Sequence, residues 1–325
     1  MVKKILKSKT LGGFGLCIAV FIILNVLMMT KVLNSYWRGV AIVCCINIIL
    51  AVSLNLATGY LGQLTLGHAG FMSVGAYTSA ILSIHLGLKT SQSPVIFILC
   101  LLAGAIMATL IGLLIGIPIL RLRGDYLCIA TLAFNEIIRV VFVNLEITNG
   151  SKGLIGIPYM TNFLYVYIFM AITIYVVYAL VNSRHGRAII SIREDEIASE
   201  LAGIPVTYYK ILAFVVSAFF AGLAGGLYAH YMTIIMPSTF DYNKSVEILV
   251  MVVLGGMGSL PGSIIAALLL TLIPELLIQF SQYRMLIYAI VLIAAMILKG
   301  SGAGERILSK LPFRKTKRIE VSGNE

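Results

Sequence analysis

The feature that most constrains this chain is a series of long apolar runs that fill nearly all of its length. Hydrophobic residues make up 60% of the 325 residues and charged residues only 11%, whereas soluble domains are less apolar. A helix needs ~20 apolar residues to cross a bilayer. The runs are at residues 11–30, 37–57, 66–86, 94–120, 126–145, 163–181, 211–232, 245–254, 261–279 and 283–298. They predict an all-α polytopic membrane protein with eight to ten transmembrane helices.

Three of these runs need comment. Run 126–145 contains two charged residues, Glu136 and Arg139. Run 245–254 is too short to span a membrane alone, so we interpret this run as part of a broken helix. Run 11–30 follows a basic start, as in a signal peptide. It is too long for one, however, and no small-residue cleavage site follows it. We therefore expect an uncleaved first span.

The formal net charge of +11 reflects 24 Lys and Arg against 13 Asp and Glu. With the N-terminus inside, most of the basic residues fall on cytoplasmic segments, which is the positive-inside pattern. The charge thus predicts that both termini are cytoplasmic, and it favours contact with anionic membrane lipid. Nucleic-acid binding is not expected, because no basic patch is interleaved with aromatic residues. We expect a transmembrane domain over residues 1–300, a polar loop at 183–210 and a basic cytoplasmic tail at 301–325.

No motif for enzyme chemistry stands out. The five cysteines lie in apolar runs without a Cys-x-x-Cys spacing, so neither a metal site nor a disulfide framework is expected. The patterns GxSxG, HExxH and GxxxxGK[ST] are absent from the sequence. If ATP drives transport by this protein, the ATPase is therefore expected on a separate chain.

Two short stretches resemble each other. GYLGQL begins at Gly59 and GGMGSL begins at Gly255, and a further glycine and an apolar run follow each. Paired breaks of this kind in two halves of a chain indicate a transport pathway, although coincidence remains an alternative in a chain with 30 glycines. The candidate pathway and helix-break residues are Gly59, Gly62, Gln63, Gly67, His68, Gly255, Gly256, Gly258 and Ser259.

Four charged residues lie within the predicted spans: Glu136, Arg139, Glu247 and Glu275. Such residues usually face a bundle interior or a cavity. Glu136 and Arg139 are three residues apart, hence on one helical face, and we expect them to pair. A proton-relay role for the acids is the alternative to a structural one, and a lone buried histidine such as His68 is more often a packing residue than a ligand.

Residues 183–205, SRHGRAIISIREDEIASELAGIP, concentrate charge between two apolar runs. Their spacing predicts one short amphipathic helix whose apolar face is Ile190, Ile197, Leu201 and Ile204. Gly203 and Pro205 give a stop signal. A helix lying on lipid is the alternative, but its acidic cluster disfavours an anionic membrane, so we favour a soluble protein partner.

Six stretches carry a resemblance to a known family. They are residues 54–77 (LNLATGYLGQLTLGHAGFMSVGAY), 120–139 (LRLRGDYLCIATLAFNEIIR), 148–158 (TNGSKGLIGIP), 183–205, 217–231 (SAFFAGLAGGLYAHY) and 248–262 (ILVMVVLGGMGSLPG). In this order they resemble the permease subunits of branched-chain amino acid ABC importers, of the LivM type. The match departs at Ala133 and Asn135, where glycine is expected, and at Pro261, where a bulky aromatic residue is usual.

The resemblance implies inward transport of branched-chain, hydrophobic amino acids across a bacterial or archaeal cytoplasmic membrane. The implied partners are a second related permease, an extracytoplasmic binding protein and two ABC ATPases. The ATPases would bind ATP and Mg²⁺, so no cofactor is expected in this chain. Residues 186–203 match the family's coupling helix, which docks on the ATPase. The matching positions are Arg187, Arg193, Glu194, Asp195, Glu196, Ala198 and Gly203.

Three other functions stay open from the sequence. An ABC permease for urea or short amides is the nearest, because substrate choice rests mainly with the binding protein. An ion-coupled secondary carrier would use Glu136, Glu247 or His68. A membrane scaffold without transport activity is disfavoured by the intramembrane acids and the glycine breaks.

Overall fold

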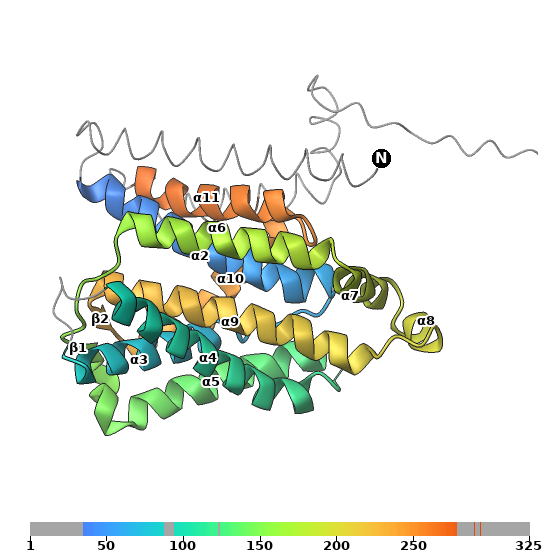
Figure 1. Ribbon diagram of the computed structural model, residues 1–325, viewed down its shortest axis with the longest axis horizontal. Coiled ribbons are helices and arrows are strands. Elements are labelled where there is room, and N and C mark those ends of the chain that lie inside the picture. The colour runs from blue at the N-terminus through green and yellow to red at the C-terminus, as the bar shows by residue number, and fades with distance from the viewer. Residues whose placement is uncertain (1–34, 88–93, 123, 278–288, 290–292, 294–325) are drawn as a thin grey trace, which may run out of the picture. The chain divides into compact units, whose positions relative to one another are not determined.

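The computed structural model describes residues 35–87, 94–122 and 124–277, together with residues 289 and 293 (Figure 1). The predicted span at 11–30, nearly all of that at 283–298 and the tail at 301–325 lie outside the described residues. The chain divides into two units, residues 1–272 and residues 273–325. The contacts below belong to the first.

Five helices are long and apolar enough to cross a membrane. They are α2 (Ser35–Asn55) with the π-helix η1 (Leu56–Tyr60) that continues it, α4 (Pro94–Ile119), α5 (Asp125–Asn144), α6 (Phe163–Val181) and α9 (Val206–Met232). Leu260–Leu276 (α11) is a shorter apolar helix, and α3 (His68–His85) and α10 (Tyr242–Gly255) are two further helices of this unit. The prediction of an all-α polytopic membrane protein is confirmed, while the number of spans stays a prediction.

The centre of the first unit is formed by α3, α4 and α9, which pack on small residues. A Cβ atom on Gly75 of α3 would overlap the backbone of Gly222 in α9, and one on Gly225 would overlap the carbonyl oxygen of Met72. Lipid tails are as apolar as leucine, so helices in a membrane associate through such close backbone packing rather than through the hydrophobic effect. The glycines of residues 217–231 therefore hold α9 against α3.

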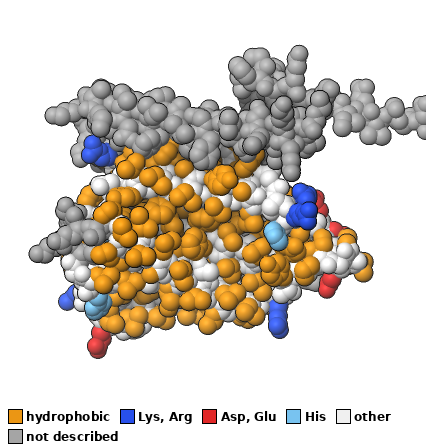
Figure 2. Space-filling model, viewed as in Figure 1, with side chains coloured by type: hydrophobic (Ala, Val, Ile, Leu, Met, Phe, Trp, Pro, Cys, Tyr) orange, Lys and Arg blue, Asp and Glu red, His pale blue; other side chains and the backbone are white. Residues whose placement is uncertain are grey.

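Two groups of short elements lie at opposite ends of the helices (Figure 1). At one end are α7 (Arg184–Glu194) and α8 (Glu196–Leu201). At the other, β1 (Leu154–Ile155) pairs antiparallel with β2 (Ile234–Ile235), and η2 (Glu146–Thr148), η3 (Gly150–Lys152) and η4 (Pro237–Phe240) lie nearby in sequence. Figure 2 shows apolar side chains over the body of the helices and most charged ones towards the ends. This distribution suits an integral membrane protein.

Candidate functional site

The first predicted glycine break lies at the end of α2. There the helix widens into the π-helix η1, a form that is frequent at functional positions. Gly62 then has φ +79, a conformation that favours glycine, and so permits the chain to turn. Residues 62–67 run without regular secondary structure until α3 begins at His68.

The second glycine turn lies directly against the first. It connects α10 to α11, with Gly256 at φ +99 and Gly258 at φ +81. The Gly258 amide donates a 2.9 Å hydrogen bond to Oδ1 of Asn55, and a Cβ atom on Gly59 would overlap the Gly258 nitrogen. The two similar stretches of the sequence thus meet in space. We call Asn55, Gly59, Gly62 and Gly258 the glycine junction.

The charged segment forms two helices, α7 and α8, which we call the elbow. Ser183 caps α7 by accepting a 3.2 Å hydrogen bond from the Gly186 amide. Asp195 is extended (φ −155, ψ 112), and its carboxylate accepts hydrogen bonds of 2.9 and 3.0 Å from the amides of Ile197 and Ala198. The prediction of one continuous helix is wrong, because this aspartate caps a second helix and interrupts the first.

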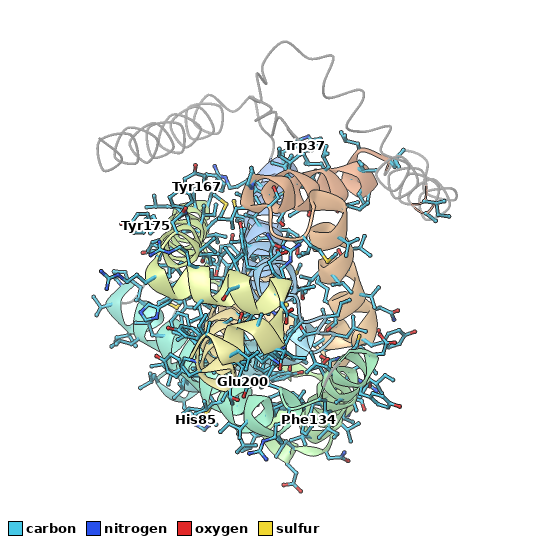
Figure 3. All side chains as sticks on the ribbon, turned by 90° about the vertical axis from the view of Figure 1, so that its right-hand side faces the viewer. Trp37, His85, Phe134, Tyr167, Tyr175 and Glu200 are labelled. Carbon is cyan, nitrogen blue, oxygen red and sulfur yellow. The ribbon has the colours of Figure 1, made fainter. Side chains whose placement is uncertain are left out.

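The four residues of the predicted apolar face do not lie on one helix, because Ile190 is in α7, Ile197 and Leu201 are in α8, and Ile204 lies beyond it. Ile197 and Leu201 are 64% and 85% exposed, whereas Ile189 and Ile192 are the buried apolar residues of α7. Helical spacing counted from Ile190 fails beyond the break, because the extended residue redirects the chain. Figure 3 looks onto this end of the helices, with α7 and α8 in front and Glu200 among them.

Arg193 joins the elbow to the glycine junction. Its Nη1 donates a 2.8 Å hydrogen bond to the carbonyl oxygen of Gly59. A Cβ atom on Gly258 would lie 2.7 Å from the same nitrogen, and one on Gly62 would lie 2.9 Å from Cγ of Arg193. The guanidinium is therefore directed at backbone that three glycines leave accessible.

The other predicted coupling positions differ in their surroundings. Glu196 pairs with Lys210 of α9 at 2.7 Å, and the Lys210 side chain is only 5% exposed, so this ion pair fastens α8 to α9. Gly203 has φ +81 just beyond α8, where the stop signal was predicted. The exposed members of the whole coupling set are Arg187, Arg193, Glu194, Asp195, Ala198 and Gly203.

His68 lies buried in the first turn of α3, and its Nε2 is 3.0 Å from the Ser53 hydroxyl. That hydroxyl donates to the carbonyl oxygen of Leu50, so it accepts from the histidine. Ser217 of α9 donates to the Ser53 carbonyl oxygen, and Ser245 of α10 accepts from the amide that follows His68. The histidine thus belongs to a polar cluster that joins four helices. Within the described residues, no His, Cys, Asp and Glu group could hold a metal ion.

The remaining glycine-turn residues have local roles. The Gln63 amide donates to the carbonyl oxygen of Ala57 at 3.1 Å, and Ser259 Oγ accepts from the Gly262 amide at 3.3 Å. A Cβ atom on Gly67 would lie 3.0 Å from a carbonyl oxygen of α5, and one on Gly255 would crowd Gly262. These contacts hold both turns close to neighbouring helices.

Three of the four charged residues predicted within the spans, Glu136, Arg139 and Glu247, form local ion pairs. Glu136 and Arg139 pair at 2.7 Å on α5, as their spacing predicts. Glu247 pairs with Lys244 at 3.0 Å, near the first turn of α10. Glu275 follows Pro274 within α11. Pairing of this kind lowers the cost of placing charge at membrane depth.

The sequence reasoning missed several polar residues of the site. Asn55 forms the junction, and Ser53, Ser217 and Ser245 form the cluster around His68. Each is a polar residue within an apolar run, which is a signal that can be read from sequence. Their partners are not readable in that way, because they lie on helices that are distant in the chain.

Comparisons with known proteins agree on one family. "Branched-chain amino acid transport system / permease component" matches residues 36–297. The high-affinity branched-chain amino acid transport system permease protein LivM of Escherichia coli is 36% identical over 298 residues, which cover 81% of this chain and 68% of the relative. LivM of Salmonella typhimurium matches with the same figures. A probable LivM permease of Methanocaldococcus jannaschii is 25% identical over 268 residues, which cover 70% of this chain and 77% of the relative. No solved structure matches.

The junction predicts a specific stability effect for Asn55→Ala. This change removes the acceptor of the Gly258 amide in a partly buried place, where leaving the amide unsatisfied costs on the order of 1 kcal/mol. We expect a lower melting temperature for the purified chain in detergent. Asn144→Ala is the matched control, since Asn144 is exposed at the end of α5. Equal melting temperatures for the two variants would contradict a stabilising role of this hydrogen bond.

Proposed function

Because the chain belongs to the family of branched-chain amino acid transport system permease components, we propose that it is the permease subunit of an ATP-driven importer for these amino acids. The observation that carries this proposal is the 36% identity to a LivM permease over 81% of the chain. As a permease it is a transport subunit embedded in the membrane, and ATP hydrolysis belongs to partner subunits. Leucine, isoleucine and valine are the proposed substrates.

The proposed assembly contains this chain, a second related permease, two ATPases that bind ATP and Mg²⁺, and an extracytoplasmic binding protein. Features of the elbow support its proposed role as the surface on which the ATPase docks. It exposes Ile197 and Leu201 at the end opposite the β1–β2 pair. Exposed apolar residues beside acidic ones suit a protein surface better than an anionic membrane. We therefore place the elbow and both termini in the cytoplasm.

The pathway is proposed to pass along residues 62–67. His68 bonds to Ser53, about two helical turns inside the end of the α2 span at Tyr60, so this irregular segment lies at membrane depth. Leu64 is 44% exposed. Non-helical backbone at this depth must be covered by protein or line a water-filled cavity. We propose that it faces the space between the two permeases.

Transport then follows from alternating access. The binding protein delivers the amino acid to the outer side, and ATP binding moves the ATPases together. The elbow carries this motion to the transmembrane helices, which rock as rigid groups and open the pathway inward. The closely packed α3, α4 and α9 suit such a rigid group.

Reconstitution of the complete complex in proteoliposomes tests this function. We expect uptake of radiolabelled leucine that requires ATP and the binding protein. Uptake that persists without ATP would contradict an ABC importer, and uptake of urea in place of leucine would contradict the proposed substrate class.

The elbow predicts that Ile197→Asp combined with Leu201→Asp will weaken ATPase binding. Both side chains are exposed, so the permease should remain folded while charge disrupts the apolar contact. Co-purification of the ATPase from detergent measures the effect. Leu122→Asp, at an exposed leucine of the turn between α4 and α5, should retain the ATPase. Full retention by the double variant would reject the elbow as the docking surface.

The pathway predicts that a cysteine at position 64 reacts with a charged, membrane-impermeant thiol reagent. Thiols react as thiolates, which form in water but not in lipid. The background variant lacks the five native cysteines, and the complete complex is labelled in membranes opened to both sides. Leu114→Cys on α4, 72% exposed, should face lipid and remain unlabelled. Equal labelling at both positions would argue against a water-filled pathway at residue 64.

A further inference from the structure

One side chain of the elbow contacts both glycine turns. Arg193 lies in the last turn of α7, directly before the break at Asp195. Its hydrogen bond reaches Gly59 in the π-helix that ends α2, and its guanidinium also lies beside Gly258 in the turn between α10 and α11. Its stem passes Gly62. Two breaks that are far apart in sequence thus share one cation.

The glycines provide the space that this arginine occupies. A Cβ atom at Gly258 would press on Nη1 and one at Gly62 would press on Cγ, each closer than ordinary van der Waals contact. The carbonyl of Gly59 accepts a charge-assisted hydrogen bond, which is among the stronger kinds in proteins. Arg193 and the three glycines therefore form a matched set.

The elbow is fastened on both sides of its break. On the α7 side, Arg193 attaches it to the glycine junction. On the α8 side, Glu196 attaches it to Lys210 of α9 by an ion pair of 2.7 Å. Between them, Asp195 is an extended residue that caps α8. Movement of α8 would thus be transmitted both to α9 and to the two glycine turns.

We propose that Arg193 is a positioning residue that transmits movement of the elbow to both glycine turns, so that the two breaks shift together. This inference rests on the proposed function, and it adds a route by which movement of the elbow reaches the transmembrane helices. The Arg193 residue is exposed, but its guanidinium is bound to backbone of this chain. Its proposed role is this internal contact and not a contact with the ATPase.

The test measures coupling, which a merely structural role would leave unchanged. Complete complexes carrying Arg193→Met, Arg193→Lys or wild-type arginine are reconstituted with the binding protein, and leucine uptake is measured together with ATP hydrolysis. Arg193→Met keeps an apolar stem but loses the donor, whereas Arg193→Lys keeps a charged donor. Arg184→Ala, at an exposed arginine of the same helix, is the control. ATPase co-purification confirms assembly of each variant.

Loss of a hydrogen bond from a charged group shifts an equilibrium roughly tenfold or more. We therefore expect Arg193→Met to hydrolyse ATP but to take up about tenfold less leucine per ATP than wild type. Arg193→Lys should keep most of the wild-type leucine uptake per ATP hydrolysed, and Arg184→Ala should keep all of it. If Arg193→Met does not assemble, Arg193→Gln gives the same test, because it also removes the charged donor while keeping a polar side chain at this position.

The outcomes separate the two proposals. If wild type and Arg193→Met, or wild type and Arg193→Gln, take up the same amount of leucine per ATP, the role of Arg193 alone is overturned. A wild-type complex that hydrolyses ATP without taking up leucine overturns the proposed function and this inference with it. A loss of ATPase binding in both Arg193→Met and Arg193→Lys overturns it as well, because the residue would then be a docking contact.

Discussion

Backbone that leaves a helix inside a membrane has to find its hydrogen-bond partners within the protein. The structure meets this requirement with a few polar side chains placed where helices end. The Asn55 amide group accepts from Gly258, the Arg193 guanidinium donates to Gly59, and the Thr131 hydroxyl accepts from the amide of Leu66. Each polar side chain supplies the hydrogen-bond partner for a helix break in another part of the chain. These hydrogen bonds therefore help determine which helices become neighbours.

The glycines serve two different purposes in this arrangement. In α3 and α9, glycines such as Gly75 and Gly222 bring helix backbones into contact and produce a closely packed centre. In the glycine junction, Gly62 and Gly258 instead adopt positive φ and leave room for an arginine. The first group favours rigidity, and the second creates turns that depend on one side chain. Motion is therefore easier to introduce at the junction than at the centre.

The sequence located most of the helices but not how they pack against one another. Apolar runs located the helices because spanning length and composition are local properties, and the Glu136–Arg139 pair follows from helical spacing alone. The break at Asp195 was also readable, since aspartate is a strong N-cap. It was missed because apolar spacing was counted across it. The contact between the glycine turns depends on how α2, α10 and α7 pack, and no local pattern specifies that.

The similarity of the two glycine stretches acquires a physical meaning once they are seen in contact. Two independent helix breaks would each need their own partners and could move separately. Here the Gly258 amide is bound by a residue of α2, and the carbonyl of Gly59 is bound by a residue of the elbow that also touches Gly258. Displacing either turn alone would break one of these hydrogen bonds, whereas moving both together preserves them. The junction therefore favours joint motion of α2 and the α10–α11 turn.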